Sequence, residues 1–142
     1  MKVKDLMTKQ VIRIRPEESV AVAARALTHY NIGMLPVCDA AGKLCGVVTD
    51  RDIVVRCLAA ERPLESTVVG DIMTGSVHCV QPEMDAAVAA HLMGRQQVRR
   101  LPVVDNGALC GMVSLGDLAQ NSESSFDATD ALGQITENIS RR

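Results

Sequence analysis

The sequence predicts an α/β (α+β) protein made of two similar halves, each with the element order β-α-β-β-α. Three observations predict this fold: an internal repeat, one Ala-rich helical pattern in each half, and paired apolar runs joined by turn residues. With 142 residues, the chain can form one ordinary domain or two small ones. Because a half of about 60 residues buries only a marginal core, we expect the halves to pack on each other.

The repeat begins with the sequence VKDLMT at residues 3–8, which returns as VGDIMT at 69–74. After one deletion in a turn, LCGVVT at 44–49 matches LCGMVS at 109–114. The two halves are therefore one structural unit written twice. We assign four segments: repeat one at 1–61, a linker at 62–68, repeat two at 69–121, and a polar tail at 122–142.

Each half is expected to open with a short strand, over Val11–Arg15 and over Val77–Gln81. A proline closes each strand because proline has no N–H for a further ladder bond. Helices follow, and their N-caps are predicted to be Ser19 and Asp85. The apolar spacing behind these caps predicts helices that end near residues 30 and 96. Each helix has one apolar face.

A β-hairpin follows each helix, with turn-forming residues between two apolar runs. The expected strands are 34–38 and 44–49 in the first half, and 101–104 and 109–114 in the second. A final helix begins at Asp50, running to about Ala60, and a shorter one begins at Leu115. The Ser-rich residues after about 121 are expected to fray or to dock on a partner.

The composition excludes several kinds of partner. A net charge of −2 and a pI near 5.9 remove the basic surface that binds nucleic acid polymers or anionic membranes. No apolar run approaches the roughly 20 residues that cross a bilayer. The N-terminus lacks the apolar core of a secretory signal, so we expect a cytoplasmic protein. The five cysteines, without CxxC spacing, are expected to be core thiols, Cys79 being the most exposed.

The sequences GVVTDRD at 46–52 and GMVSLGD at 111–117 share a pattern in which a strand ends in a hydroxyl and an aspartate follows three residues later. Together with the VKDLMT and Leu-Pro-Val repeats, this pattern resembles the CBS domain, present as a tandem pair over nearly the whole chain. The resemblance implies a pseudo-symmetric disc of two repeats packed sheet to sheet. It also implies clefts between the repeats that bind adenosine nucleotides or related adenosyl compounds, and a role in sensing rather than catalysis.

The residue chemistry at these motifs suits a ribose phosphate. Thr49 and Ser114 can each donate a hydroxyl hydrogen to a phosphate oxygen where a strand passes into a helix. Asp52 and Asp117, one helical turn later, can accept hydrogen bonds from both hydroxyls of a ribose. The alternative is purely structural, in which the hydroxyls cap the helices and the aspartates favour the helix dipole.

The resemblance also implies where the purine would lie, between the first strand and the Leu-Pro-Val strand of a repeat. The implied contacts in the two sites are Val11, Met34 and Pro36 in one, and Val77, Arg100 and Pro102 in the other. His78 would lie beside the second site, where a neutral imidazole could contact the ligand. The two prolines also have a structural interpretation, since they mark edge positions where a missing donor is harmless.

The two candidate sites differ in charge. Arg51 follows Thr49 in the first repeat, whereas Arg99 and Arg100 precede the Leu-Pro-Val strand of the second. These three arginines are the phosphate-binding candidates, because a guanidinium group can form two hydrogen bonds with a phosphate. Their alternative role is surface solubility.

The sequence therefore predicts a regulatory module, not an enzyme, that senses AMP, ADP, ATP or a related adenosyl ligand. It would need no cofactor and would signal to an unidentified protein through a change of shape or assembly. The main alternative is a ligand-free interaction or dimerisation scaffold. A small enzyme and a thiol or metal sensor are less supported, because no catalytic or metal-ligand set is recognisable. We also expect a homodimer through the second helices, with Ile53, Leu58 and Met93 as interface candidates.

Overall fold

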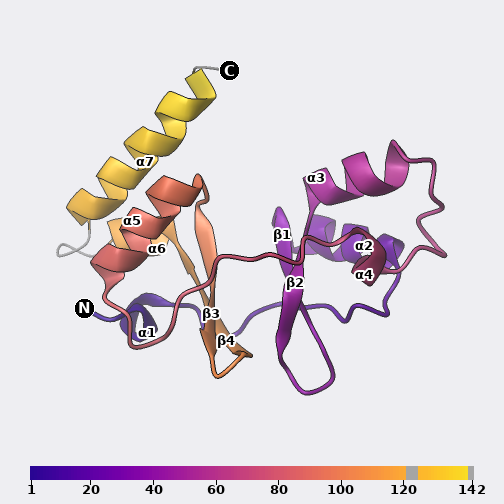
Figure 1. Cartoon of the computed structure of the whole chain (residues 1–142), viewed down its shortest axis with the longest axis horizontal. Coiled ribbons are helices and arrows are strands. Elements are labelled where there is room, and N and C mark those ends of the chain that lie inside the picture. The colour runs from indigo at the N-terminus through magenta and orange to yellow at the C-terminus, as the bar shows by residue number, and fades with distance from the viewer. Residues whose placement is uncertain (121–124, 141–142) are drawn as a thin grey trace. The chain divides into compact units, whose positions relative to one another are not determined.

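The structure, a computed structural model, describes residues 1–120 and 125–140, and the side chains of 1–120 and 127–137. It divides into two compact units that do not coincide with the two sequence repeats. One unit is Ile12–Val77, and the other joins Met1–Val11 to the chain from His78 onward. Each unit contains one β-hairpin and its helices (Figure 1). Each is described below by itself.

The unit Ile12–Val77 surrounds an antiparallel hairpin in which Met34 pairs with Thr49. The helix that follows the hairpin begins at Asp50 as predicted and changes to a π-helical turn, which ends at Leu58, close to the predicted end near Ala60. The elements are α2 (Val20–Tyr30), β1 (Met34–Cys38), β2 (Leu44–Thr49), α3 (Asp50–Ile53), η1 (Val54–Leu58) and α4 (Val69–Ile72).

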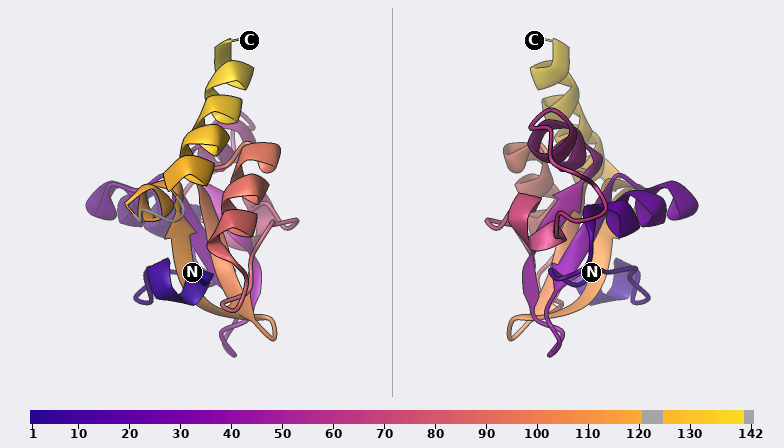
Figure 2. Two further views of the ribbon diagram at one scale, coloured as in Figure 1. Left: turned by 90° about the vertical axis from the view of Figure 1, so that its left-hand side faces the viewer. Right: turned by 90° about the vertical axis from the view of Figure 1, so that its right-hand side faces the viewer.

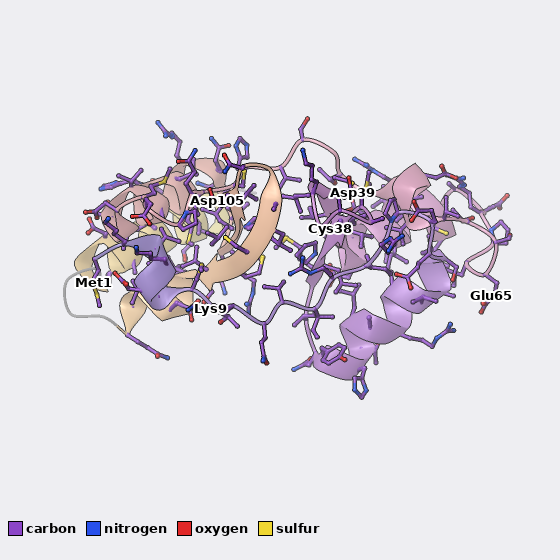
Figure 3. All side chains as sticks on the ribbon, turned by 90° about the horizontal axis from the view of Figure 1, so that it is seen from below. Met1, Lys9, Cys38, Asp39, Glu65 and Asp105 are labelled. Carbon is purple, nitrogen blue, oxygen red and sulfur yellow. The ribbon has the colours of Figure 1, made fainter. Side chains whose placement is uncertain are left out.

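The other unit surrounds the second hairpin, in which Arg100 pairs with Ser114. Its elements are α1 (Val3–Leu6), α5 (Ala86–Gln96), β3 (Arg100–Asp105), β4 (Ala108–Ser114), α6 (Leu115–Ala119) and α7 (Ser125–Ser140). The predicted caps are confirmed, since the Ser19 and Asp85 side chains accept hydrogen bonds at the starts of α2 and α5. Asp39 follows β1 and Asp105 ends β3, so both lie at hairpin turns (Figure 3).

The first strand predicted in each repeat is reduced to a single parallel bridge, at Ile14 and at Val80. Ile14 N–H donates to the Pro36 carbonyl at 3.0 Å, and Cys38 N–H donates to the Ile14 carbonyl at 2.9 Å. The next ladder bonds would need N–H groups from Pro16 and Pro36, which have none. Proline thus limits the pairing on both sides. Pro36 lies in an edge strand of a two-stranded sheet, and within the described residues the side of β1 away from β2 carries only the isolated bridge with Ile14, as the edge interpretation predicted.

The N-terminal segment of each sequence repeat packs in the compact unit that holds the other repeat's hairpin. Thr8 exchanges backbone hydrogen bonds with Met112 at 2.8 and 3.0 Å. Thr74 does the same with Val47, also at 2.8 and 3.0 Å. This close approach explains the motif glycine of the first hairpin, because a Cβ at Gly46 would collide with the Thr74 carbonyl oxygen. The exchange explains why the units and the repeats have different boundaries.

The tail is helical and packs within its own chain, so the expectation that it frays is wrong for Ser125–Ser140. Residue 121 of repeat two and residues 122–124 and 141–142 of the predicted tail lie outside the described residues. Ala128, Ala131 and Ile135 join the buried core around α5. Helix α7 lies beside α5 and α6, as two perpendicular directions of view show (Figures 1 and 2).

Two of the three predicted dimer-interface residues belong to the cores instead. Met93 is fully buried and Ile53 nearly so, whereas Leu58 is about half exposed. Their side chains point inward because they complete the apolar faces of α5 and α3 against their own hairpins. No helix in the described ranges is long and apolar enough to cross a bilayer.

Candidate functional site

The hydroxyl and aspartate of each motif form a reciprocal cap at the start of a short helix. Asp52 N–H donates to Thr49 Oγ1 at 3.0 Å, and Thr49 N–H donates to Asp52 Oδ2 at 3.0 Å. Ser114 and Asp117 repeat this pair at 3.1 and 2.8 Å. These residues therefore cap their helices, as the purely structural interpretation of the motif predicted. Each hydroxyl accepts through its oxygen, which leaves its hydrogen available to donate to a ligand.

Asp52 has further partners inside its own unit. The Thr74 hydroxyl lies 3.1 Å from Asp52 Oδ1 and 3.3 Å from Oδ2, and Arg56 Nε lies 3.8 Å from Oδ1. The residue is buried, with 7% of its surface exposed. A ribose hydroxyl would have to compete with Thr74 for this carboxylate. The binding of a ribose by Asp52 stays a prediction.

Asp117 has fewer partners. Its Oδ2 accepts the backbone N–H of Ser114, and no side-chain donor to this carboxylate is found among the described residues. The carboxylate lines a cavity of about 280 Å³ together with Asp5, Leu6 and Gln120. Asp117 is therefore more accessible to a hydroxyl-bearing ligand than Asp52. Its ribose role also stays a prediction.

A larger cavity of about 390 Å³ brings together three of the predicted phosphate-binding residues. Their order in the chain explains the arrangement, because Arg100 and Ser114 face each other as the first pair of the β3–β4 hairpin. A backbone hydrogen bond of 2.8 Å from Leu115 N–H to the Arg99 carbonyl holds the start of α6 against the same strand end. The lining residues are Arg99, Arg100, Ser114, Leu115, Gly116, Ala119, Ala128, Thr129 and Leu132.

The larger cavity has a positive electrostatic character. Among the described residues, its walls carry two guanidinium groups and no acidic side chain. Both arginines are exposed, and neither forms an ion pair with a carboxylate in the described part of the chain. Unpaired arginines beside a hydroxyl donor suit a phosphate or another anion. Asp117 is not among the lining residues, so this cavity holds the hydroxyl of the motif without its aspartate.

Helix α7 supplies part of this wall, which sequence reasoning missed. Ala128, Thr129 and Leu132 line the cavity. The available signal was the helical spacing of Ala128, Ala131, Leu132 and Ile135, an apolar stripe within an otherwise polar tail.

The remaining predicted site residues are divided between the two units. Met34, Pro36, Thr49, Arg51, Asp52 and Val77 lie in Ile12–Val77, whereas Val11, His78, Arg99, Arg100, Pro102, Ser114 and Asp117 lie in the other unit. Arg51 and His78 are exposed, Val11 and Met34 are half-buried, and both prolines are buried. The two predicted purine contact sets combine residues of both units, and they stay predictions.

The cysteines are arranged as thiols of differing exposure. Cys79 is exposed as predicted, and Cys38 and Cys57 are buried. Burial raises the pKa of the Cys38 thiol, and burial also raises that of Cys110. No cluster of three or more His, Cys, Asp or Glu side chains suited to a metal ion is found within the described residues.

Comparison with known proteins supports the two-repeat interpretation. The family model described as "CBS domain" matches residues 3–58 and 69–124. The "CBS domain-containing protein YhcV" of Bacillus subtilis is 40% identical over 134 residues, which cover 94% of each chain. A crystal structure of Hypoxic Response Protein I with two coordinated zinc ions is 31% identical, with a TM-score of 0.77 over 84% of this chain and 98% of that one.

A further solved structure is a crystal structure of CBSX2 in complex with AMP. It is 33% identical to this chain, with a TM-score of 0.73, and the match covers 84% of this chain and 93% of CBSX2.

Proposed function

We propose, from the premise that this chain belongs to the CBS-domain family as a tandem pair, that it is a regulatory module for an adenosine nucleotide. The phosphate of the ligand would bind in the larger cavity, to Arg99, Arg100 and Ser114. The observation that carries this proposal is the pair of guanidinium groups beside a hydroxyl donor, with no carboxylate paired to them or lining the cavity in the part of the chain that the structure describes.

The size and charge of the cavity both favour a phosphorylated ligand. Its volume of about 390 Å³ falls in the range of about 300–1,000 Å³ that small-molecule sites occupy. The guanidinium groups of Arg99 and Arg100 attract a phosphate and repel a ligand whose net charge is positive. AMP, ADP and ATP therefore fit better than the sulfonium compound S-adenosylmethionine. The similar protein CBSX2 was solved with AMP, which supports the nucleotide class.

Signalling would follow from a change in shape or assembly. The described lining of the larger cavity offers no carboxylate, histidine or cysteine as a catalytic group. We propose that a second copy of the chain covers the apolar surface of η1, where Val54, Val55 and Leu58 are each about half exposed. These three large apolar side chains of one short helical segment form a patch that a self-complementary dimer would bury. The regulated protein is not specified by these features.

A second candidate function is a ligand-free scaffold, and one observation favours it for the first repeat. The Asp52 carboxylate is already engaged by Thr49, Thr74 and Arg56 inside its own unit. A carboxylate that already accepts hydrogen bonds from the protein gains less free energy when it binds a ribose hydroxyl. Under this alternative neither repeat binds nucleotide, and the motif serves the fold alone.

Calorimetric titration with AMP, ADP, ATP and S-adenosylmethionine tests the proposal. We expect a phosphorylated nucleotide to bind, and the combined Arg99→Ala and Arg100→Ala variant to lose at least about tenfold in affinity, because each charge-assisted hydrogen bond contributes about 1.5–3 kcal/mol. Arg95→Ala is the matched control, since Arg95 is an exposed arginine on α5 that does not line the cavity. Equal nucleotide affinities in the two variants would contradict the proposal, and absence of nucleotide binding would favour the scaffold.

A further inference from the structure

The larger cavity has both polar and apolar lining residues. Arg99, Arg100, Ser114 and Thr129 are polar, whereas Leu115, Ala119, Ala128 and Leu132 supply apolar surface. Two of these four apolar side chains belong to α7, which begins at Ser125, beyond the residues that the family model matches. Leu132 is the large one of the two, and 40% of its surface is exposed. The cavity thus suits an anion attached to an apolar body.

We propose that α7 is a ligand-contacting wall of this cavity, so that ligand binding and the docking of α7 stabilise each other. The apolar face of the adenosine would lie against Leu132 and Ala128 while the phosphate binds to the arginines. This inference rests on the proposed function. It differs from the purine placement that the family resemblance implies, against Val77 and Pro102.

The docking of α7 depends on a close approach to α5. A Cβ at Gly94 would lie 3.1 Å from the Ala131 Cα and would collide with the Gln134 side chain. The buried residues of α7 next to this point are Ala128 and Ala131, both small. His91 Nε2 and Asp127 Oδ1, which are 3.5 Å apart, are a further contact between the two helices. A larger residue at Gly94 would therefore displace α7 from α5.

The docking of α7 and the binding of the ligand are thermodynamically linked. A ligand that contacts α7 binds the docked form of the helix more tightly than an undocked form, because only the docked form presents Leu132. The same coupling requires the ligand to increase the fraction of molecules in which α7 is docked. Removing the leucine contact should then cost about five- to tenfold in affinity, which corresponds to the burial of part of one leucine side chain.

Three full-length variants test the inference, with AMP as the probe. Leu132→Gln keeps a good helix former while removing the apolar contact. Gly94→Val forces α7 away from α5. Gly133→Ala is the matched control, because a Cβ at Gly133 meets no atom within 4 Å. We expect AMP affinity to fall about five- to tenfold in Leu132→Gln and at least as much in Gly94→Val, and to stay unchanged in Gly133→Ala.

Hydrogen exchange gives an independent readout. Saturating AMP should slow exchange of the α7 amides in the wild-type protein, and this protection should be smaller in Leu132→Gln. If AMP binds in an arginine-dependent manner but both variants bind like the wild type and α7 exchange is unchanged, this inference is overturned while the proposed function stands. If AMP does not bind at all, both fail. Loss of AMP affinity in Val77→Ala with none in Leu132→Gln would instead support the purine placement implied by the family.

Discussion

Asp52 and Asp117 occupy matching positions in the two repeats, but their surroundings differ. Asp52 is buried and accepts hydrogen bonds from Thr49 and Thr74, whereas Asp117 accepts the Ser114 N–H and lines a cavity. The cause lies in the threonine that each hairpin receives from the other repeat's N-terminal segment. Thr74 turns its hydroxyl to Asp52, while the hydrogen bonds found for Thr8 among the described residues are backbone bonds to Met112.

The difference shows that two copies of one motif can have different surroundings. The carboxylate of the first copy contacts a threonine hydroxyl and an arginine inside its unit. The aspartate of the second copy and two nearby arginines each line a cavity. Under the proposed function, the second copy would bind the ligand and the first copy would stabilise its unit.

The largest expected effect concerns the motif glycines. Gly46→Ala should lower the free energy of unfolding by about 3 kcal/mol, because its Cβ would collide with backbone at Thr74. Gly111→Ala should cost less, about 2 kcal/mol, because the Thr8 carbonyl oxygen, at 2.9 Å from its Cβ, is farther away than the Thr74 oxygen is at Gly46, and the Met7 sulfur at 2.7 Å is flexible. Urea unfolding measures both. Gly75→Ala is the control, with no atom within 4 Å of its Cβ, and equal losses at Gly46 and Gly111 would contradict the asymmetry.

An intermediate effect is expected at the aspartates. Asp52→Ala should cost about 2–3 kcal/mol of unfolding free energy, because it leaves the Thr74 hydroxyl without its acceptor and removes the helix cap. Asp117→Ala should cost about 1 kcal/mol, the usual loss for a cap. Thermal and urea unfolding of the two variants give the comparison. Thr74→Val should weaken stability while Thr8→Val should not, and the reverse order would refute the inward role of the first motif.

The smallest effect is expected at Glu83, which holds α1 in its unit. Glu83 contacts Lys2 Nζ at 2.7 Å and Lys4 Nζ at 2.9 Å, whereas the ion pair found for the matching Glu17 among the described residues is with Arg15, at 3.7 Å. The hydrogen bond from Lys2, followed by that from Lys4, lowers the pKa of Glu83 from 4.5 to about 2. A lowered carboxyl pKa stabilises the folded form above pH 4.5, and this contribution is lost as the pH falls toward about 2.

Because these groups are exposed, salt should screen the contribution of Glu83. The melting temperature of Glu83→Gln at pH 7 should therefore lie slightly below that of the wild type in low salt and equal it in high salt. Glu17→Gln is the matched control. A salt-independent loss in Glu83→Gln, or an equal loss in Glu17→Gln, would show that α1 is not held by this cluster.

Much of the fold could be predicted because strong local signals determine it. The bounds of α2 and α5 follow from their caps and periodicity, and the hairpins follow from their turn residues. Helices α1 and α4 were not predicted, because a single turn has no periodicity to detect. The bridge at Ile14 replaced a strand because prolines occupy both neighbouring ladder positions. The exchange of N-terminal segments is a long-range packing outcome with no local pattern.

The candidate site was predictable in part for the same reason. The hairpin register predicts that Arg100 lies opposite Ser114, and Arg99 is next to Arg100 in the chain. The internal partner of Asp52 could not, since Thr74 lies 22 residues away in the other repeat. Helix α7 was missed because its buried residues are mostly alanines within a polar segment.

A crystal structure of the full chain grown with AMP tests the central claim most directly. The account predicts a phosphate within hydrogen-bond distance of the Arg99 or Arg100 guanidinium group and of the Ser114 hydroxyl, with Asp52 still bonded to Thr74. A phosphate held by Arg51 and Thr49 instead, with Asp52 turned to the ribose and the arginine cavity empty, would contradict it.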